Sequence, residues 1–237
     1  MAVARPNVEL LQKIELFKNL PDDVLESVLA SARRLTFPRG VSIFHQGDRA
    51  TAFYLLLEGR VRLVQVTPDG HQVLMRFITP GEAFAVIAVL TDITYPVSAE
   101  TVDDAVVLCW SGETFMELME KHPRIAINAV RILAARTREF QDRLREMATE
   151  RVERRLAHTL LRLARQAGRK VHNGILIDIA LTRQDLAEMT GTTLYTVSRI
   201  LKKWEEAGLV RIGRKWVVIR DPHSLVALAE DLPLHSS

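Results

Sequence analysis

The sequence predicts an α+β protein with a β-roll of the jelly-roll type in its first half, one long helix in the middle and a winged helix-turn-helix at its end. Three observations predict this class. Short β-rich runs punctuated by glycine extend from residue 36 to about residue 110. Apolar residues then recur with a helical period after Pro123, and residues 181–209 contain two short amphipathic helices around a glycine. The predicted domains are residues 1–122, 123–150 and 151–237.

The composition is that of an ordinary globular protein, with 48% hydrophobic and 26% charged residues. No apolar run approaches the ~18 residues of a membrane span, and the N-terminus lacks a signal-peptide pattern, so we expect a cytoplasmic protein. The single cysteine, Cys109, excludes a disulfide framework within the chain. It also excludes an iron–sulfur cluster, or a zinc site made only of cysteines, held by one chain.

Positive charge is concentrated near the carboxyl end. The net charge is +3, but residues 151–220 hold 15 Lys and Arg against 6 Asp and Glu, whereas residues 1–150 hold 17 against 20. Neutralisation of phosphates by Lys and Arg supplies most of the non-specific affinity of proteins for DNA. The basic segment coincides with the helix-turn-helix pattern and therefore indicates a nucleic-acid partner.

Residues 7–35 have the apolar spacing of short helices, and the β-rich region follows them. Pro68, Asp69 and Gly70 separate two β-rich runs and predict a hairpin. Several short strands at this spacing are typical of a closed or nearly closed β structure. Such a roll can hold a small ligand or can be filled by its own side chains, and both alternatives stay open.

Residues 113–121 predict a short helix, and Pro123 begins a long one. Its apolar residues alternate spacings of four and three, which is the period of a coiled-coil seam, most simply between two identical subunits. The alternative is a helix that lies against its own β-roll, a role that suits Ile125 and Ile132 on a flanking face. We expect the chain to use both faces. The seam comprises Ala126, Val130, Leu133, Thr137, Phe140, Leu144 and Met147.

A basic amphipathic helix after Glu150 begins the third domain, Gly168 ends it, and a short strand follows at residues 175–179. The joint at residues 147–152 is also expected to be helical, so that one continuous helix can transmit rotation. Thr182 is a good N-cap for the next helix, and Asp185 completes a reciprocal capping pattern.

The turn and the second helix complete the motif. Gly191 supplies the left-handed backbone that a sharp turn needs, and Thr192 or Thr193 caps a second helix with apolar spacing. Such a helix can enter the major groove of DNA with its first residues on the base edges. Two β-rich runs around residues 213–215 predict a hairpin with a basic tip, the wing. A helical core module with an incidental hairpin is the alternative; the cap, the glycine and the basic tip together favour DNA binding.

The order of these parts resembles the Crp/Fnr superfamily of bacterial transcription regulators over nearly the whole chain. The segments that carry the resemblance are GVSIFHQGD at 40–48, FYLLLEGRVRL at 53–63, PGEAF at 80–84 and TRQDLAEMTGTTLYTVSRIL at 182–201. The resemblance implies a cyclic-nucleotide-binding-like β-roll and a homodimeric, sequence-specific DNA-binding regulator controlled by a signal sensed in that roll. Its implied partners are double-stranded DNA with two-fold related half-sites, a second copy of the chain, and RNA polymerase.

By matching position, the resemblance implies that Arg199 grips a guanine edge and that Ser198 reads a base, as in the Fnr-like branch. Guanine N7 and O6 favour a bidentate guanidinium, worth ~1–3 kcal/mol of discrimination. Tyr195 departs from the pattern, because it stands in place of the usual glutamate that accepts from cytosine N4, and this leaves the half-site sequence open. The predicted DNA-binding residues are Thr182, Arg183, Gln184, Thr192, Thr193, Leu194, Tyr195, Thr196, Ser198, Arg199, Lys202, Lys203, Arg214 and Lys215.

The cyclic-AMP branch of the superfamily has a phosphate clamp that this chain lacks. Val97 stands where that branch has the guanidinium for the cyclic phosphate, and Val86 stands where it has the acid for the ribose hydroxyl. An anionic phosphate would be desolvated there without compensation, so we do not expect cyclic AMP as the effector. The oxygen-sensing branch uses four cysteines, so we do not expect an iron–sulfur cluster either.

The apolar pocket that remains resembles the nitric-oxide and haem-linked branch more than the others. Haem needs an axial ligand, for which His71, His122, Cys109 or a methionine are the candidates. An unknown apolar effector, or none at all, is the competing interpretation. The predicted effector pocket comprises Phe84, Ala85, Val86, Ile87, Tyr95, Val97 and Ser98.

Two other function classes compete with a signal-controlled regulator. One is a ligand-independent architectural DNA-binding protein, in which the β-roll serves only as a dimer scaffold. The other is an enzyme, because β-rolls of the cupin type bind metals through clustered His and Glu. Here His45 and His71 are isolated, no His-x-His pair occurs, and no nucleophile–base constellation is visible. We therefore predict that the protein is not an enzyme.

Overall fold

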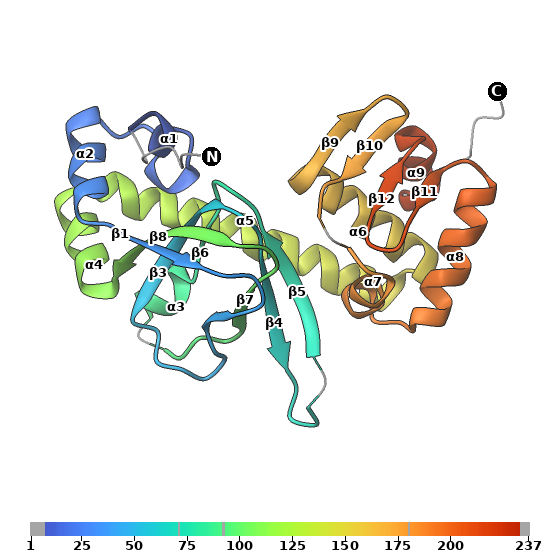
Figure 1. Ribbon diagram of the computed structural model, residues 1–237, viewed down its shortest axis with the longest axis horizontal. Helices are drawn as coiled ribbons and strands as arrows, with labels where there is room; N and C mark the ends of the chain where they lie inside the picture. Colours follow the sequence, from blue (N-terminus) through green and yellow to red (C-terminus); the bar gives the residue numbers. More distant parts are fainter. Residues whose placement is uncertain (1–7, 71, 92, 180, 233–237) are drawn as a thin grey trace. The chain divides into compact units, whose positions relative to one another are not determined.

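The computed structural model describes residues 8–70, 72–91, 93–179 and 181–232 (Figure 1). The chain forms two compact units, the first made of residues 1–71 and 75–140 and the second of residues 72–74 and 141–237. The three predicted domains remain a prediction, since this division does not test them. None of the helices among the described residues combines the length and the apolar character needed to cross a membrane.

The first unit is a β-roll of two four-stranded sheets with helices around it. One sheet has the order β1-β8-β3-β6 and the other the order β2-β7-β4-β5, which confirms the expected β-roll and the hairpin at residues 68–70. The elements up to residue 149 are α1 (Val8–Gln12), the 3-10 helix η1 (Glu15–Phe17), α2 (Asp22–Ala30), β1 (Arg33–Phe37), β2 (Ser42–Phe44), β3 (Ala52–Glu58), β4 (Val61–Val66), β5 (Gln72–Ile78), β6 (Ala83–Phe84), α3 (Val86–Leu90), β7 (Ser98–Thr101), β8 (Ala105–Ser111), α4 (Gly112–Lys121) and α5 (Pro123–Thr149). The first residues of β5 and the end of α5 are assigned to the second unit.

The expected helical region at residues 7–35 is wrong at its end. Strand β1 begins at Arg33, which pairs with Cys109 of β8 in an antiparallel ladder. The partner strand lies more than 70 positions further along the chain, and pairing with it overrides the local helical preference of residues 33–35.

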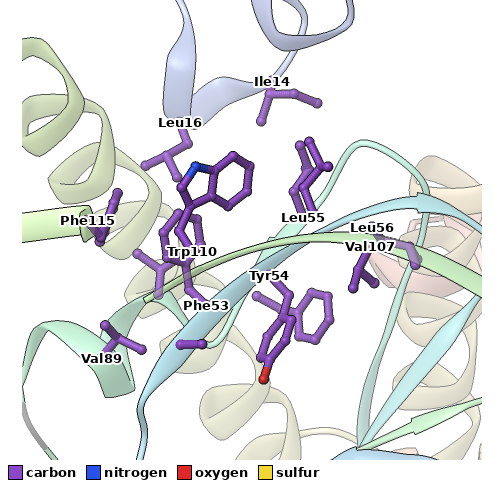
Figure 2. Packing of buried hydrophobic residues seen from close by; sticks show 14 of the residues in the cluster. Ile14, Leu16, Phe53, Tyr54, Leu55, Leu56, Val89, Val107, Trp110 and Phe115 are labelled. Carbon is purple, nitrogen blue, oxygen red and sulfur yellow. The ribbon is translucent and has the colours of Figure 1, made fainter. Parts of the chain in front are cut away.

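Aromatic side chains fill the core between the sheets and the helices. Figure 2 shows Phe53, Trp110 and Phe115 packed together; the ring centroids of Phe53 lie 5.0 Å from Trp110 and 4.2 Å from Phe115. The indole nitrogen of Trp110 donates to the carbonyl of Val28 at 2.9 Å, which satisfies its polar group and ties β8 to α2.

One face of α5 belongs to this core. Ile125 is fully buried, and Ile132 packs against the same cluster. The buried amide of Asn128 donates to the carbonyls of Leu16 at 3.2 Å and Lys18 at 2.9 Å, which fixes the helix to η1. The expectation that a flanking face of this helix lies on its own β-roll is confirmed.

The second unit is a winged helix-turn-helix with a small sheet. Its elements are α6 (Val152–Ala167), β9 (Gly168–Val171), β10 (Gly174–Ile177), α7 (Arg183–Thr190), α8 (Leu194–Glu206), β11 (Val210–Ile212), β12 (Val217–Ile219) and α9 (Pro222–Ala229). The strands form one antiparallel sheet in the order β11-β12-β10-β9, so the wing hairpin is continuous with the strand that precedes the motif.

The expected helical joint at residues 147–152 is wrong. Helix α5 ends at Thr149, and Arg151 has extended backbone angles, φ −67° and ψ 152°, as the N-cap of α6. The side chain of Arg155 donates to the carbonyl of Glu150 at 2.8 Å, which helps to satisfy the end of the first helix. The two helices are therefore separate elements, joined by residues 150 and 151.

Candidate nucleic-acid interface and ligand cavity

Two side-chain caps and one glycine set the geometry of the helix-turn-helix. The hydroxyl of Thr182 accepts from the Asp185 amide at 3.1 Å, and the Asp185 carboxylate accepts from the Thr182 amide at 2.8 Å, a complete capping box. Gly191 ends α7 in the left-handed region, with φ 60°. Thr193 caps α8 by accepting from the amide of Thr196 at 3.2 Å. The predicted caps and turn are confirmed, and Thr193 is the cap of the second helix.

The inner face of α8 is anchored to the rest of the unit. Val197, Leu201 and Trp204 are buried. The indole nitrogen of Trp204 donates to the carboxylate of Glu153 on α6 at 3.1 Å. This buried stripe and the Trp204–Glu153 hydrogen bond together hold the helix in one orientation. A helix that recognises a ligand through its outer face requires such a fixed orientation.

The outer face of α8 carries a polar and basic row in solvent. Tyr195, Arg199 and Lys202 are exposed and lie four and three positions apart, so they share one side of the helix. Tyr195 is 75% exposed, more than any other large hydrophobic side chain among the described residues. An exposed row of one phenol and two cationic groups suits contacts with base edges in a major groove and with its flanking phosphates.

The wing is closed by a tight contact at its tip. The Gly213 amide donates to the carbonyl of Trp216 at 2.9 Å, and a β-carbon at Gly213 would lie only 2.2 Å from the Trp216 ring. The guanidinium of Arg211 lies 5.7 Å from the centre of that ring, which is cation–π distance. Arg214 and Lys215 at the tip are exposed.

The remaining predicted DNA-binding residues take several positions. Lys203 is held by the Glu153 carboxylate at 3.2 Å and belongs to the α6–α8 contact as much as to the outer face. The Thr182, Thr193 and Thr196 hydroxyls are engaged in the caps. Arg183, Gln184 and Leu194 are exposed, whereas Thr192 and Ser198 are partly buried.

A second feature is a cavity of about 200 Å³ inside the first unit. Its lining includes six of the seven predicted effector residues, Phe84, Ala85, Val86, Ile87, Tyr95 and Val97. Ser98 is not part of the lining; it is buried, and its hydroxyl accepts from the Gln46 amide at 2.9 Å.

Ala85 introduces strain at the edge of this cavity. It precedes α3 with φ 65° and ψ 6°, the left-handed region that alanine rarely adopts. A glycine at this position would adopt the same backbone without the strain.

Sequence reasoning missed two charged residues of the cavity. Arg76 on β5 and Arg136 on α5 both line it. They lie 60 positions apart in the sequence, and no local motif marks either of them. The available signal was that Arg136 lies four positions from Ile132 and therefore shares the side of the helix that faces the β-roll.

The candidates for a haem ligand do not converge on the cavity. No histidine, cysteine or methionine occurs in its lining among the described residues. His122 ends α4, Cys109 lies half-buried on β8, and burial raises the pKa of its thiol; His71 falls outside the described residues. The described residues also contain no cluster of three or more His, Cys, Asp or Glu suited to a metal ion. These residues do not fit haem at this place.

The comparisons with known proteins agree with this architecture. Residues 34–122 match the cyclic nucleotide-binding domain family, and residues 154–228 match the Crp-like helix-turn-helix domain family. The chain is 32% identical over 214 residues, 90% of its length and 96% of the relative's, to the cyclic AMP receptor protein of Thermus thermophilus.

Two solved structures from Thermus thermophilus are also similar. The catabolite activator protein is 32% identical with a TM-score of 0.54, covering 92% of this chain and all of the other. A CRP-family transcriptional regulator is 26% identical with a TM-score of 0.66, covering 84% and 97% of the two chains. A β-roll followed by a Crp-like helix-turn-helix defines a DNA-binding transcription regulator rather than an enzyme. The chain belongs to the Crp/Fnr family of transcription regulators.

Proposed function

We propose that the protein acts as a homodimer whose two α8 helices bind two-fold related half-sites under the control of a signal received in the β-roll. The exposed row of Tyr195, Arg199 and Lys202 supports specific reading of DNA. A two-fold operator needs two such helices about one helical turn, ~34 Å, apart, which a symmetric pair of chains supplies.

An apolar row on α5 is the observation that carries this proposal. Val130, Phe140, Leu144 and Met147 are 64%, 62%, 60% and 53% exposed, and Leu133 is 42% exposed. A continuous apolar face of this kind is rare on a monomer and common where a partner covers it. The alternating four- and three-residue spacing favours the same helix of a second copy as that partner. The other predicted seam residues are Ala126, which is partly buried, and Thr137, whose hydroxyl donates to the carbonyl of Leu133.

Signal control requires a ligand that distinguishes the DNA-competent state from the incompetent one. The cavity is the place we propose for that ligand, because Ile132 and Arg136 bring α5 into its wall. We do not propose cyclic AMP as this ligand, because Val86 and Val97 stand where the cyclic-AMP branch has its acid and its guanidinium. RNA polymerase as a partner and the cytoplasm as the compartment belong to the same proposal, since the regulator acts on genomic DNA.

The experiment is operator selection from random duplexes, followed by binding titrations on the selected and a scrambled duplex. Arg199→Ala is expected to lower the preference for the selected duplex about 5- to 150-fold, which corresponds to ~1–3 kcal/mol, with little change on the scrambled one. Lys202→Ala is the matched variant, because Lys202 lies on the same row. It is expected to weaken binding to both duplexes equally and to reduce the salt dependence of binding.

If Arg199→Ala weakened binding to both duplexes equally, Arg199 would not take part in base recognition. The same titrations also separate the competing architectural function. An architectural protein would select no two-fold sequence, and no small molecule would change its affinity for DNA.

A further inference from the structure

The cavity of the first unit is apolar except for two guanidinium groups. Phe44, Leu63, Ile78 and Ile132 contribute to its walls, and Arg76 of strand β5 and Arg136 of helix α5 also line it. Two guanidinium groups in an otherwise apolar wall offer hydrogen-bond donors that an acidic ligand can use.

The two arginines share one carboxylate. The Glu82 Oε1 atom accepts from the Nη2 atom of Arg76 and lies 3.5 Å from the Nη2 atom of Arg136. The other oxygen of Glu82 is already held by the amide and the hydroxyl of Thr79, at 2.8 and 2.9 Å. Glu139 accepts from Nη1 of Arg136 at 3.0 Å.

Each guanidinium keeps donors beyond these bonds. A guanidinium has five N–H donors, and the bonds named here, together with the one from Nε of Arg76 to the carbonyl of Phe77 at 3.2 Å, use only some of them. The Arg76 side chain is only 19% exposed, and its burial lowers the pKa of the guanidinium, an effect that Glu82 opposes. A partly desolvated cation with unused donors gains free energy from a further anionic acceptor.

The size of the cavity limits the ligand. A cavity of about 150 Å³ is sufficient for benzene, so about 200 Å³ suits a molecule of about ten non-hydrogen atoms.

We propose that this cavity binds a small apolar monocarboxylic acid, with its hydrocarbon part among the apolar walls and its carboxylate accepting from Arg76 and Arg136. Aromatic and short aliphatic acids share this chemistry. The inference names the class of signal in the proposed function and rests on it only for the regulatory consequence, not for the binding.

Binding would alter the contact between the β-roll and α5. The acid competes with Glu82 for Arg136, and so weakens the contact between Glu82 and that helix. Because Arg136 lies between Leu133 and Phe140 on α5, an altered position of this helix reaches the proposed dimer seam.

The test is calorimetric titration of the full-length, DNA-free protein with phenylacetate and octanoate. The neutral probe 2-phenylethanol and the cationic probe 2-phenylethylamine match the first acid in size. Saturable binding of one acid or both, with at least tenfold weaker binding of the other two probes, is expected. Arg136→Gln should lower the affinity for the acid at least tenfold, whereas Arg138→Gln, on the exposed face of the same helix, should leave that affinity unchanged.

Val97→Phe keeps both arginines and fills the cavity, so it should abolish binding while the protein stays folded by circular dichroism. Equal affinity for 2-phenylethanol, unchanged affinity in Arg136→Gln, or binding of cyclic AMP in place of the acids would overturn the proposal. Since no DNA is present, failure here is distinct from failure of the proposed regulator, which the operator titrations test.

Discussion

Phe140 offers a direct perturbation of the proposed dimer. Its ring is 62% exposed in the single chain and sits in the middle of the apolar row on α5. In a two-fold interface each substitution is counted twice, because the same patch occurs on both subunits. Phe140→Ala therefore removes two rings from the interface and leaves the packing within one chain almost unchanged.

The expected magnitude follows from the exposed area. An aromatic side chain carries about 200 Å², of which the exposed 62% is about 120 Å². Alanine still covers part of this area, so about 80 Å² is lost per subunit, worth about 2 kcal/mol at ~25 cal/mol per Å². For the two subunits of a dimer, the loss of association free energy is therefore at most about 4 kcal/mol. Because buried area is not fully converted to affinity, we expect a loss of about 2–4 kcal/mol. The dimer dissociation constant should rise at least about 30-fold.

Sedimentation equilibrium over a range of protein concentrations measures this constant. Met116→Ala is the control, because Met116 is 44% exposed on α4 and lies outside the seam. We expect it to leave the constant unchanged. A Phe140→Ala protein that dimerises as tightly as the parent, or an equal loss in the control, would refute the reasoning.

Three further substitutions test the local structure. Ala85→Gly relieves the left-handed strain before α3 and should raise the melting temperature of the β-roll by about 2–4 °C, followed by near-ultraviolet circular dichroism. Gly213→Val displaces the Trp216 ring and should weaken DNA binding several-fold without changing sequence preference, read in the titrations on both duplexes. Thr182→Ala removes a cap worth ~1 kcal/mol and should speed amide hydrogen exchange in α7 about fivefold, with the amides of α2 as the internal reference.

Much of the second unit could be predicted from the sequence because its signals are local. The capping box, Gly191 and the buried stripe of α8 each depend on residues within a few positions of one another. Strand β9 and helix α9 were not predicted. Strand β9 depends on pairing with β10, and α9 has an Asp221 cap that follows the wing without a marked apolar period.

The cavity shows where prediction from residues that are neighbours in the sequence fails. The apolar residues around α3 were found because they are consecutive, whereas Arg76 and Arg136 meet there only through the fold. The same limit explains the helical joint, since the extended backbone at Arg151 depends on contacts around Glu150 rather than on a glycine or proline. Helix propensity at residues 147–152 gives no sign of the break.

In the proposed dimer, two α8 helices, one from each subunit, recognise a single DNA duplex. This is most directly tested by hydroxyl-radical footprinting of the full-length chain on its selected operator. Two protected regions of equal strength, related by a two-fold axis and centred about one helical turn apart, are the expected result. One asymmetric region, or protection that ignores the sequence, would contradict it.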